Sequence, residues 1–393
     1  MNEIPSFAFN LHTDLRFGAG RAQELPGWLE ASGWRRVALV VDSGAAANPY
    51  WRAVETILLQ KFEVVRLESD MAEPSYDYLD QARKQFADKD LDVFVAVGGG
   101  STLDLGKALS LLVTNLKPAI EYRGFDQPKN AGVPLVAVPT TAGSGSEVTP
   151  NAVFTDTSEQ RKFGINTALY LPRFCVLDPN LTASCPPQVA TSSGMDALVH
   201  THESYVSRQA TPITKIFSIA AFELLFNHLA AAVEEKFNVA ARGHVLLGSY
   251  LAGTALFNSS SGPCGGLSYP LGVQYKVPHG LAGAVFLPHI MAHNVARGYT
   301  GYKALYDRVA GAPSIADPVA AGEALTERMF ALCRRLNVPS RLEAFQFQRA
   351  NLDGFMVHVR KLQAAFDFNP IPFGADDARR ILEEMTAPLA AKD

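Results

Sequence analysis

The first half of the chain alternates short, continuous apolar runs with segments in which apolar residues recur at helical spacing. The runs that indicate buried strands, rich in β-branched residues, span 36–42, 62–68, 91–100, 133–141 and 174–179. Amphipathic segments such as 49–60 and 76–88 separate the first four of them. Because apolar strands joined by helices pair in parallel and are covered on both faces, this half predicts an α/β domain with a parallel sheet.

After about residue 186 the β-branched runs disappear and long helical patterns replace them. The clearest cover 214–235, 243–256, 316–336 and 376–390. The chain has 393 residues, 48% of them hydrophobic, whereas single cores seldom serve more than about 250–300 residues. We therefore expect two domains, an α/β domain over 1–185 and an all-helical domain over 186–393.

Charge and composition narrow the class of ligand. The formal net charge is −4 and no cluster of lysine or arginine is present, which argues against a nucleic-acid partner and favours a small molecule. The N-terminus lacks the order of a signal peptide, and no uninterrupted apolar stretch reaches about 18 residues, so we expect a cytoplasmic protein without a membrane span. The sparse cysteines, without a CxxC pair, are expected to be free thiols; they are Cys175, Cys185, Cys264 and Cys333.

Two glycine-rich loops follow predicted strands. In VFVAVGGGSTLDLGKAL (93–109) a strand ends in Gly98, Gly99 and Gly100 and a helix begins near Ser101. Glycines let the backbone approach an anion, and a helix N-terminus offers unpaired N–H groups, so the segment suits a pyrophosphate. A glycine-rich turn without a ligand is the alternative. The second loop, PTTAGSGSE (139–147), follows another strand and would face the same crevice of a parallel sheet, which favours a dinucleotide.

Asp42 ends the predicted strand 36–42. A carboxylate there can accept hydrogen bonds from an adenosine ribose and would repel a 2′-phosphate, so it favours NAD over NADP. Taken alone, an aspartate at a strand end is more often a turn former or a helix cap.

Asp196 and His200 lie four residues apart in a segment with helical character, so both point from one helix face. Carboxylate and imidazole suit Zn²⁺ or Fe²⁺, and His279 could complete a site from a distant helix. Three protein ligands would leave a position open for a substrate. The plain alternative for the pair is an exposed polar contact.

Five ordered motifs together carry a family resemblance: GGGSTLDLGKAL, PTTAGSGSEVTP, DPNLT, GMDALVHTHESYVS and PHGLAGAVFLPHIMAHN. In this order the chain resembles the iron-containing (group III) alcohol dehydrogenases. The resemblance implies a Rossmann-like NAD(P)-binding α/β domain, an all-helical C-terminal domain, a catalytic divalent metal and at least a homodimer.

The resemblance also implies roles for individual positions. Asp42 matches the ribose discriminator, Asp196, His200 and His279 match three of four metal ligands, and Lys162 resembles a lysine near the cofactor ribose. The two nucleotide loops of the family are matched by Gly98, Gly99, Gly100 and Ser101 and by Thr140, Thr141, Ser144 and Ser146.

The chain departs from the family where an HxxxHxLG pattern is usual. Gly265 and Tyr269 stand at the two histidine positions, of which the first is a metal ligand in the family. The chain therefore has either a metal site with three protein ligands or a lost one. We favour a working site, because retaining Asp196, His200 and His279 together would otherwise need three separate explanations.

These observations predict a metal-dependent, NAD(P)-linked alcohol dehydrogenase or aldehyde reductase. The cation, Fe²⁺ or Zn²⁺, would polarise the substrate oxygen, and hydride would pass between nicotinamide and carbon. Tyr269, His202 and His293 are candidates to carry the proton, and the substrate is expected to be a functionalised or sugar-like alcohol or aldehyde. The alternatives are an NAD- and metal-dependent lyase of the dehydroquinate synthase type and a non-catalytic nucleotide-binding protein.

Overall fold

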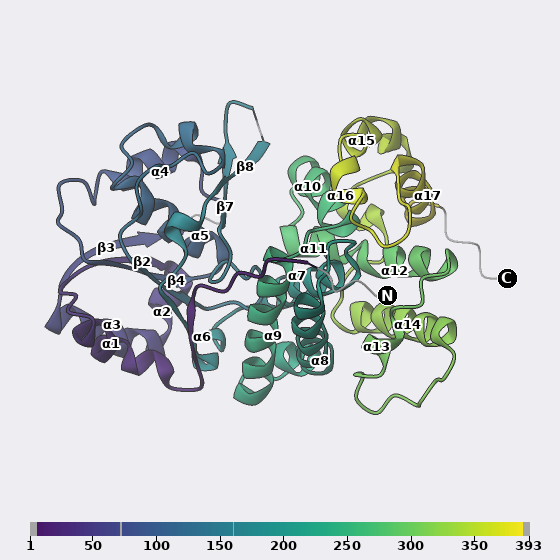
Figure 1. Ribbon diagram of the computed structural model, residues 1–393, viewed down its shortest axis with the longest axis horizontal. Helices are drawn as coiled ribbons and strands as arrows, with labels where there is room; N and C mark the ends of the chain where they lie inside the picture. The colour runs from purple at the N-terminus through teal and green to yellow at the C-terminus, as the bar shows by residue number, and fades with distance from the viewer. Residues whose placement is uncertain (1–5, 71–72, 160, 388–393) are drawn as a thin grey trace. The chain divides into compact units, whose positions relative to one another are not determined.

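The computed structural model describes residues 6–70, 73–159 and 161–387 (Figure 1). The chain divides into two compact units. The sheet unit consists of Asn10–Ala190 and Glu235–Tyr250, and the helical unit consists of the described residues of Met1–Phe9, Thr191–Glu234 and Leu251–Asp393. The division thus falls after Ala190 rather than at the expected position 185, and part of a later helix belongs to the sheet unit.

Six strands form the parallel sheet of the sheet unit, in the order β1-β9-β6-β4-β2-β3. Their bounds are β1 (Asp14–Phe17), β2 (Arg36–Asp42), β3 (Glu63–Ser69), β4 (Val93–Gly98), β6 (Leu135–Pro139) and β9 (Phe174–Leu177). Every residue of β4, β6 and β9 is buried, as expected for strands covered on both faces. The predicted α/β domain with a parallel sheet is confirmed.

A second, three-stranded sheet was not predicted. It has the order β5-β8-β7, with β5 (Gly124–Phe125), β7 (Asn151–Asp156) and β8 (Arg161–Asn166).

The helices that accompany both sheets are α1 (Leu25–Ala31), α2 (Ser43–Ala47), α3 (Pro49–Lys61), α4 (Tyr76–Arg83), α5 (Gly100–Leu112) and α6 (Pro179–Thr182). Short 3₁₀ helices lie at Arg21–Glu24, Ala119–Tyr122, Ala168–Tyr170, Leu342–Phe345 and Arg349–Asn351.

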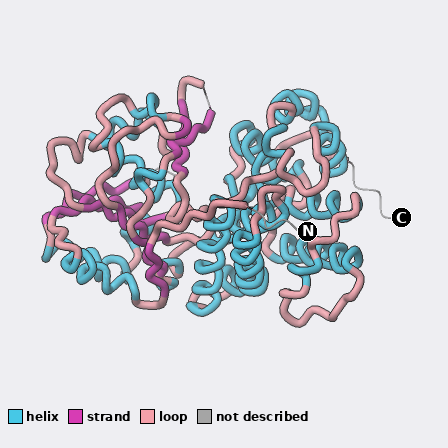
Figure 2. Tube along the Cα trace, in the orientation of Figure 1, coloured by secondary structure: helices cyan, strands magenta, loops and turns pink. Residues whose placement is uncertain are grey.

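The second half of the chain is helical, as predicted. After β9 no described residue belongs to a strand (Figure 2). The helices are α7 (Pro187–Val206), α8 (Pro212–Glu234), α9 (Val239–Phe257), α10 (Pro263–Tyr275), α11 (His279–Ala284), α12 (Leu287–Ala296), α13 (Lys303–Tyr306), α14 (Pro318–Arg335), α15 (Leu352–Val359), α16 (Gln363–Phe366) and α17 (Ala375–Met385). The helix expected over 376–390 thus ends at Met385, and positions 388–390 lie outside the described residues.

Helix α8 is long and apolar enough to cross a membrane by length and composition, with a mean hydropathy of 1.7 in its most apolar window. The sequence-based expectation concerned an uninterrupted apolar stretch, whereas α8 includes the polar residues Lys215, Glu223 and Asn227. The buried residues of α8 include Thr214, Ser218, Ala221, Leu225 and Leu229, spaced so that they share one face. A stripe of this kind is typical of a helix packed in a protein core.

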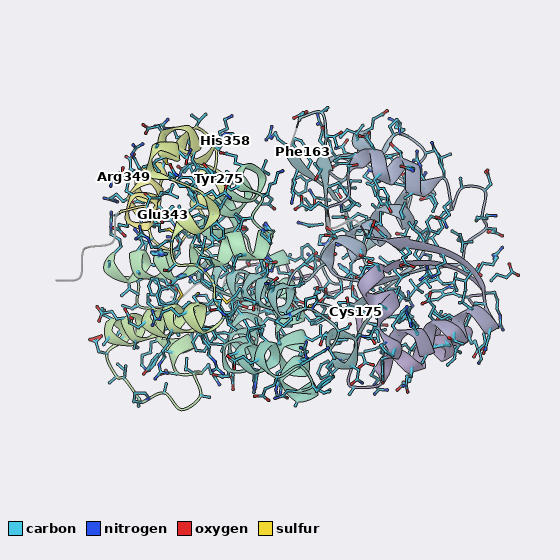
Figure 3. The ribbon with its side chains drawn as sticks, turned by 180° about the vertical axis from the view of Figure 1, so that it is seen from behind. Phe163, Cys175, Tyr275, Glu343, Arg349 and His358 are labelled. Carbon is cyan, nitrogen blue, oxygen red and sulfur yellow. The ribbon has the colours of Figure 1, made fainter. Side chains whose placement is uncertain are left out.

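Aromatic packing closes the end of α10. Tyr275, labelled in Figure 3, lies 5.1 Å from Phe347 and 6.5 Å from Phe355 between ring centroids. All four cysteines are free thiols, as expected. Cys175, also labelled in Figure 3, is fully buried in β9.

Candidate active site

The two glycine-rich loops lie side by side. They follow β4 and β6, which pair in parallel with Gly98 opposite Pro139, and the backbone N–H of Thr140 donates to the carbonyl of Gly98 at 2.9 Å. A Cβ atom on Gly100 would lie 2.6 Å from the hydroxyl oxygen of Ser144. Position 100 therefore needs glycine for the loops to approach this closely, and both present backbone at the same edge of the sheet.

Asp42 lies at this edge as well. Its carboxylate accepts hydrogen bonds from the backbone N–H of Ala45 at 2.6 Å and of Gly99 at 3.0 Å. It therefore caps α2 and also holds the first glycine loop. A Cβ atom on Gly98 would lie 2.3 Å from Asp42 Oδ2, so glycine is required there too.

Helix α5 anchors the second loop through the side chain of Lys107. The ammonium group of Lys107, fully buried, donates to the carbonyl oxygens of Ser146 at 2.9 Å and Thr149 at 3.3 Å and to that of Asn151. It also lies 3.2 Å from Asp104 Oδ1. Sequence reasoning missed this pair, although a lysine three residues after an aspartate in an otherwise apolar helix was a visible signal.

The predicted cofactor residues differ in accessibility. Ser146 is 4% exposed and donates its hydroxyl to Asp104, and Thr140 is 7% exposed. Ser144 is exposed, whereas Thr141 and Ser101 are half-buried. Lys162, on β8, forms an ion pair with Glu73. The structure thus brings the two loops and Asp42 together and places Lys162 in the smaller sheet.

Asp196, His200 and His279 form one cluster in the helical unit, with one ligand atom from each residue within 4.8 Å of the others. Asp196 Oδ1 lies 3.6 Å from His200 Nε2 and 3.9 Å from His279 Nε2. These distances are too long for hydrogen bonds. They are slightly larger than the separation of about 3.3 Å expected between ligands of one tetrahedral zinc ion. The residues therefore fit a divalent cation.

Burial supports the same interpretation. Asp196 is 7% exposed, so its carboxylate is largely shielded from water. Neither of the two imidazole nitrogens beside this carboxylate is hydrogen-bonded to it. One carboxylate oxygen and two imidazole nitrogens are the donor set expected of a catalytic zinc or iron site. The exposed side of the cluster is His279, whose side chain is 43% exposed.

Helix packing explains why residues about 80 positions apart converge. Asp196 and His200 share a face of α7, as predicted, and His279 is the first residue of α11. A Cβ atom on Gly280 would lie 2.2 Å from the carbonyl oxygen of Ser192 and 2.8 Å from Asp196 Cβ. Glycine at 280 therefore lets α11 begin directly against α7.

At position 265 the backbone N–H donates to the carboxylate of Glu203. The sequence did not predict this contact. A Cβ atom on Gly265 would lie 2.2 Å from Ser261 Oγ and 3.0 Å from Glu203 Oε2. Glu203, 1% exposed, accepts from Gly265 N at 2.9 Å and from Ser261 Oγ at 2.8 Å. Burial raises the pKa of Glu203, while these hydrogen bonds oppose the shift. Its position three residues after His200, on the same helix face, was the signal available.

The candidate proton carriers lie in different environments. Tyr269 is 45% exposed and its ring centroid lies 5.3 Å from that of His279. His202 is 3% exposed and its Nε2 lies 2.7 Å from the hydroxyl of Tyr302. Burial lowers the pKa of His202 to about 3, so it stays neutral, away from solvent. Only Tyr269 contacts a residue of the metal cluster through an aromatic pair.

His293 and Cys264 also lie apart from the cluster. The ring of His293 packs edge-on against Phe373 at 5.1 Å, and burial lowers its pKa. Cys264 is fully buried and burial raises the pKa of its thiol. Neither has the ligand geometry of Asp196, His200 and His279.

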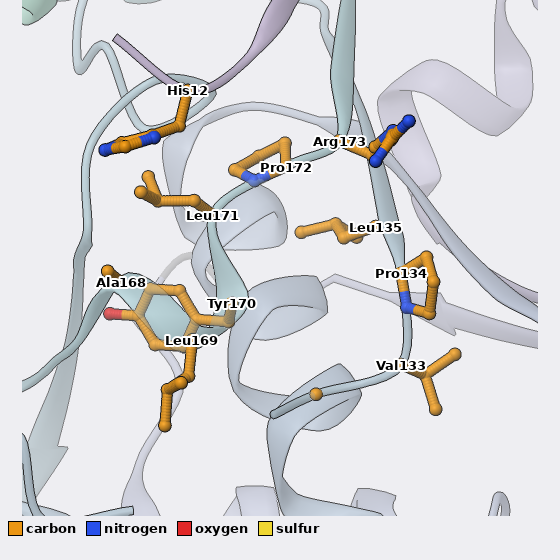
Figure 4. A pocket seen from close by; sticks show the side chains of 11 residues that line it. His12, Val133, Pro134, Leu135, Ala168, Leu169, Tyr170, Leu171, Pro172 and Arg173 are labelled. Atoms are coloured by element: carbon orange, nitrogen blue, oxygen red, sulfur yellow. The ribbon is translucent and has the colours of Figure 1, made fainter. Parts of the chain in front are cut away.

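The sheet unit also has a pocket of about 330 Å³ that is separate from the two glycine-rich loops (Figure 4). Its lining includes Pro134, Leu135 and Arg173, with His12 and Leu171. These residues lie at the amino ends of β6 and β9, whereas the glycine loops follow the carboxyl ends of β4 and β6. The pocket is therefore not part of the candidate nucleotide site.

Comparison with known families decides the class. Residues 12–179 match the family model described as iron-containing alcohol dehydrogenase, and residues 190–386 match that of the C-terminal domain of the same family. The chain belongs to the iron-containing alcohol dehydrogenase family. The resemblance drawn from the sequence motifs is therefore confirmed.

Individual relatives of this family extend over almost the whole chain. Alcohol dehydrogenase 4 of Saccharomyces cerevisiae is 29% identical over 373 residues, covering 94% of this chain and 95% of the relative. The 1-propanol dehydrogenase PduQ of Salmonella typhimurium is 30% identical over 384 residues, covering 96% and 99%. The crystal structure of a 1,3-propanediol oxidoreductase superposes with a TM-score of 0.90 at 26% identity, covering 97% of this chain and 100% of that one.

Membership in the iron-containing alcohol dehydrogenases establishes the reaction class. The chain is a metal-dependent oxidoreductase that acts on CH–OH groups, with NAD and a divalent metal as cofactors. The predicted enzyme class is confirmed, and the lyase of the dehydroquinate synthase type is not favoured.

Proposed function

We propose that this chain interconverts a short functionalised alcohol and its aldehyde, with Asp196, His200 and His279 as the protein ligands of the catalytic cation. The observation that carries the assignment is the convergence of one oxygen and two nitrogen atoms within 4.8 Å. When bound, a divalent cation supplies Lewis acidity toward the reacting oxygen, and the nicotinamide supplies or accepts hydride. The cation is Fe²⁺ or Zn²⁺, since both accept carboxylate and imidazole ligands.

Three protein ligands leave room at the cation for the substrate. Gly265 contributes no side chain, and the neighbouring carboxylate of Glu203 is committed to hydrogen bonds with Ser261 and Gly265. Relatives named as 1-propanol and 1,3-propanediol dehydrogenases act on short alcohols. We extend this class to the present chain, with a second polar group on the substrate, because the site has an exposed, polar side at His279 and Tyr269.

Tyr269 is the residue we assign to proton transfer. Its ring lies beside His279 and nearly half of it is exposed, so its hydroxyl can exchange protons with solvent. A nearby cation would favour the ionised form of the phenol. His202 and His293, the other two candidates, are less well placed, because His202 is buried against Tyr302 and His293 packs on Phe373.

In the sheet unit we assign the pyrophosphate to the loop of Gly98, Gly99, Gly100 and Ser101. The second loop, with Thr140, Thr141 and Ser144 and with Ser146 as an internal brace, borders it. Asp42 would accept from the adenosine ribose and disfavour NADP, since its charge stands next to the first loop. Lys162 would reach the ribose only after leaving Glu73.

We further propose a cytoplasmic homodimer. The edge strand β1, with three of its four residues exposed, is a candidate for pairing with a second copy. Light scattering coupled to gel filtration would return twice the chain mass, and a monomer at micromolar concentration would contradict the assignment.

The function is tested by screening short alcohols and aldehydes with NAD(H), using protein stripped by a chelator and then supplied with Zn²⁺, with Fe²⁺ or with no metal. We expect turnover that disappears on chelation and returns with one of the cations, together with net production or consumption of NADH. Equal turnover with and without bound metal would contradict the assignment. Turnover without any net change in NADH would point to a lyase, and NADH binding without turnover would indicate a non-catalytic protein.

A further inference from the structure

Ser268 contacts both Gly265 and His279, and His279 belongs to the metal cluster. It is located on α10, 1% exposed. Its hydroxyl donates to the carbonyl oxygen of Gly265 at 2.7 Å, and the same oxygen lies 3.3 Å from His279 Nδ1. No motif of the sequence pointed to this residue.

The two contacts together decide which nitrogen of His279 carries the proton. A serine hydroxyl has one hydrogen, and a carbonyl oxygen can only accept, so that hydrogen is directed to Gly265. The contact with His279 then requires Nδ1–H as donor and the serine oxygen as acceptor. In this tautomer Nε2 carries the lone pair, and Nε2 is the atom 3.9 Å from Asp196 Oδ1.

We propose that Ser268 is a positioning residue for the metal ligand His279, holding the ring in the Nδ1–H tautomer with Nε2 directed to the cation. This inference rests on the proposed metal site. Histidines that bind metals generally donate their other ring N–H to an oxygen, which fixes the ring orientation and raises the basicity of the ligating nitrogen. A neutral hydroxyl that is itself polarised by the Gly265 carbonyl meets that requirement.

The support of Ser268 is itself anchored to the helix that bears the other ligands. Glu203, on α7 with Asp196 and His200, accepts the backbone N–H of Gly265 at 2.9 Å. Gly265 is thus held by its N–H from α7, and its carbonyl fixes the hydroxyl of Ser268. A continuous series of hydrogen bonds therefore runs from α7 through the first turn of α10 to the ligand on α11.

Packing contributes from the other side of the ring. Tyr269, the next residue along α10, lies 5.3 Å from His279 between ring centroids, which limits rotation of the imidazole. Ser268 supplies the direction and Tyr269 the lateral restraint. Ser268 is uncharged, so removing its hydroxyl leaves the charge of the cluster unchanged. We therefore expect a different affinity for the cation with the same three ligands.

The test is the affinity of the metal-free, full-length protein for Zn²⁺, measured by competition with a chromogenic chelator. We expect Ser268→Ala to weaken Zn²⁺ binding about 10- to 100-fold, the range found when an outer partner of a ligand is removed. Ser268→Thr, which keeps the hydroxyl, should bind Zn²⁺ more tightly than Ser268→Ala. Co²⁺ bound in place of Zn²⁺ should show an altered visible spectrum only in the alanine variant.

Ser218→Ala is the matched control. Ser218 is a fully buried serine of the same unit whose hydroxyl, like that of Ser268, has two partners: it donates to the carbonyl of Thr214 at 2.8 Å and lies 2.8 Å from the hydroxyl of Ser204. It should leave Zn²⁺ affinity unchanged, and thermal unfolding without metal should be similar in all variants. Wild-type affinity in Ser268→Ala would overturn the role of Ser268 while leaving the metal site intact. A wild-type protein that binds no cation would overturn the metal site, and the inference with it.

Discussion

Gly280 shows how a single residue determines whether the three ligands meet. Its backbone lies so close to α7 that any Cβ would overlap the carbonyl oxygen of Ser192 and approach Asp196 Cβ to 2.8 Å. Because the obstructing atoms are backbone and the first carbon of a ligand, neither can move without displacing the site itself. Glycine at 280 is therefore as necessary to the proposed metal centre as the histidine before it.

The variant Gly280→Ala should lose metal affinity by at least about 10-fold and lower the free energy of unfolding by about 1–3 kcal/mol, the usual cost of overpacking. Metal titration and denaturant unfolding would measure the two effects. Gly354→Ala is the control, since Gly354 lies in α15 and a methyl group added there would meet no other atom within 4 Å, and alanine is favoured in helices. An equal effect of both substitutions would contradict the packing argument.

Asp42 carries the prediction about the nucleotide. Replacing it by asparagine removes the negative charge but leaves an oxygen that can accept one of the two backbone N–H groups now bound. We expect NADPH to gain on NADH by about 10-fold in Asp42→Asn, because a like-charge repulsion near 4 Å amounts to about 1–4 kcal/mol. Equilibrium binding of both nucleotides would measure it. An unchanged ratio would show that the ribose lies elsewhere.

At this scale the sequence predicted the relative placement of those residues whose spacing is itself informative. Asp196 and His200 are four apart on a helix, so their common face followed from periodicity. Ser268 and Glu203 could not be recognised in the same way. Their roles depend on how the first turn of α10 packs on α7, and no local pattern encodes that packing.

Among the elements, α5 has two functions. Its N-terminus follows the first glycine loop, and its half-buried Asp104 and fully buried Lys107 hold the second loop and the strand after it through Ser146 and Asn151. The same helix therefore connects both halves of the proposed nucleotide site. Burial lowers the pKa of Lys107, opposed by Asp104, and three carbonyl oxygens also favour the charged form.

Lys107→Met should disorder the second loop. We expect NADH binding to weaken by about 10-fold or more, because the loop loses its preorganisation, and stability to fall by about 3–5 kcal/mol, since Asp104 loses its charged partner. Fluorescence titration with NADH and denaturant unfolding would measure the two effects.

Lys61→Met serves as the comparison. Lys61 pairs with Glu30 on the surface, with the two side chains 49% and 37% exposed, and exposed pairs contribute about 0–1 kcal/mol. It should therefore behave as wild type in both measurements. If Lys107→Met also bound NADH like wild type, the second loop would not depend on α5.

The elements that the sequence predicted well are those with strong periodicity. Strand β2 was predicted at its observed bounds, and α3 and α8 within one or two residues. Strand β1 and the hairpin β7–β8 were missed. Strand β1 has only four residues with a mostly exposed pattern. In the hairpin, polar Thr and Asp residues obscure the alternation of buried and exposed positions. Their pairing is decided by tertiary partners rather than by local sequence.

For the whole molecule, burial of the cysteines gives a prediction that is independent of the site. Cys175 and Cys264 are fully buried, Cys333 is 3% exposed, and burial raises the pKa of Cys185 to about 11. At pH 8 the thiols should therefore be almost entirely protonated and react slowly with a disulfide reagent. We expect all four to react rapidly only after unfolding, and a fast stoichiometric reaction of the native protein would contradict the fold.

Domain organisation was predicted in outline but not in detail. The composition indicated an α/β half and a helical half, and both exist. The assignment of Glu235–Tyr250 to the sheet unit could not be predicted, because α9 is one continuous helical pattern and its sequence does not record which part packs against which core.

The central claim is that one divalent cation is held by Asp196, His200 and His279. The most direct test is anomalous diffraction from crystals of the active, metal-loaded protein, recorded on both sides of the absorption edge of the bound metal. We predict a single strong peak about 2.0–2.2 Å from one atom of each of the three side chains. Active crystals in which these three residues surround no anomalous peak, or in which the metal lies elsewhere, would contradict the claim.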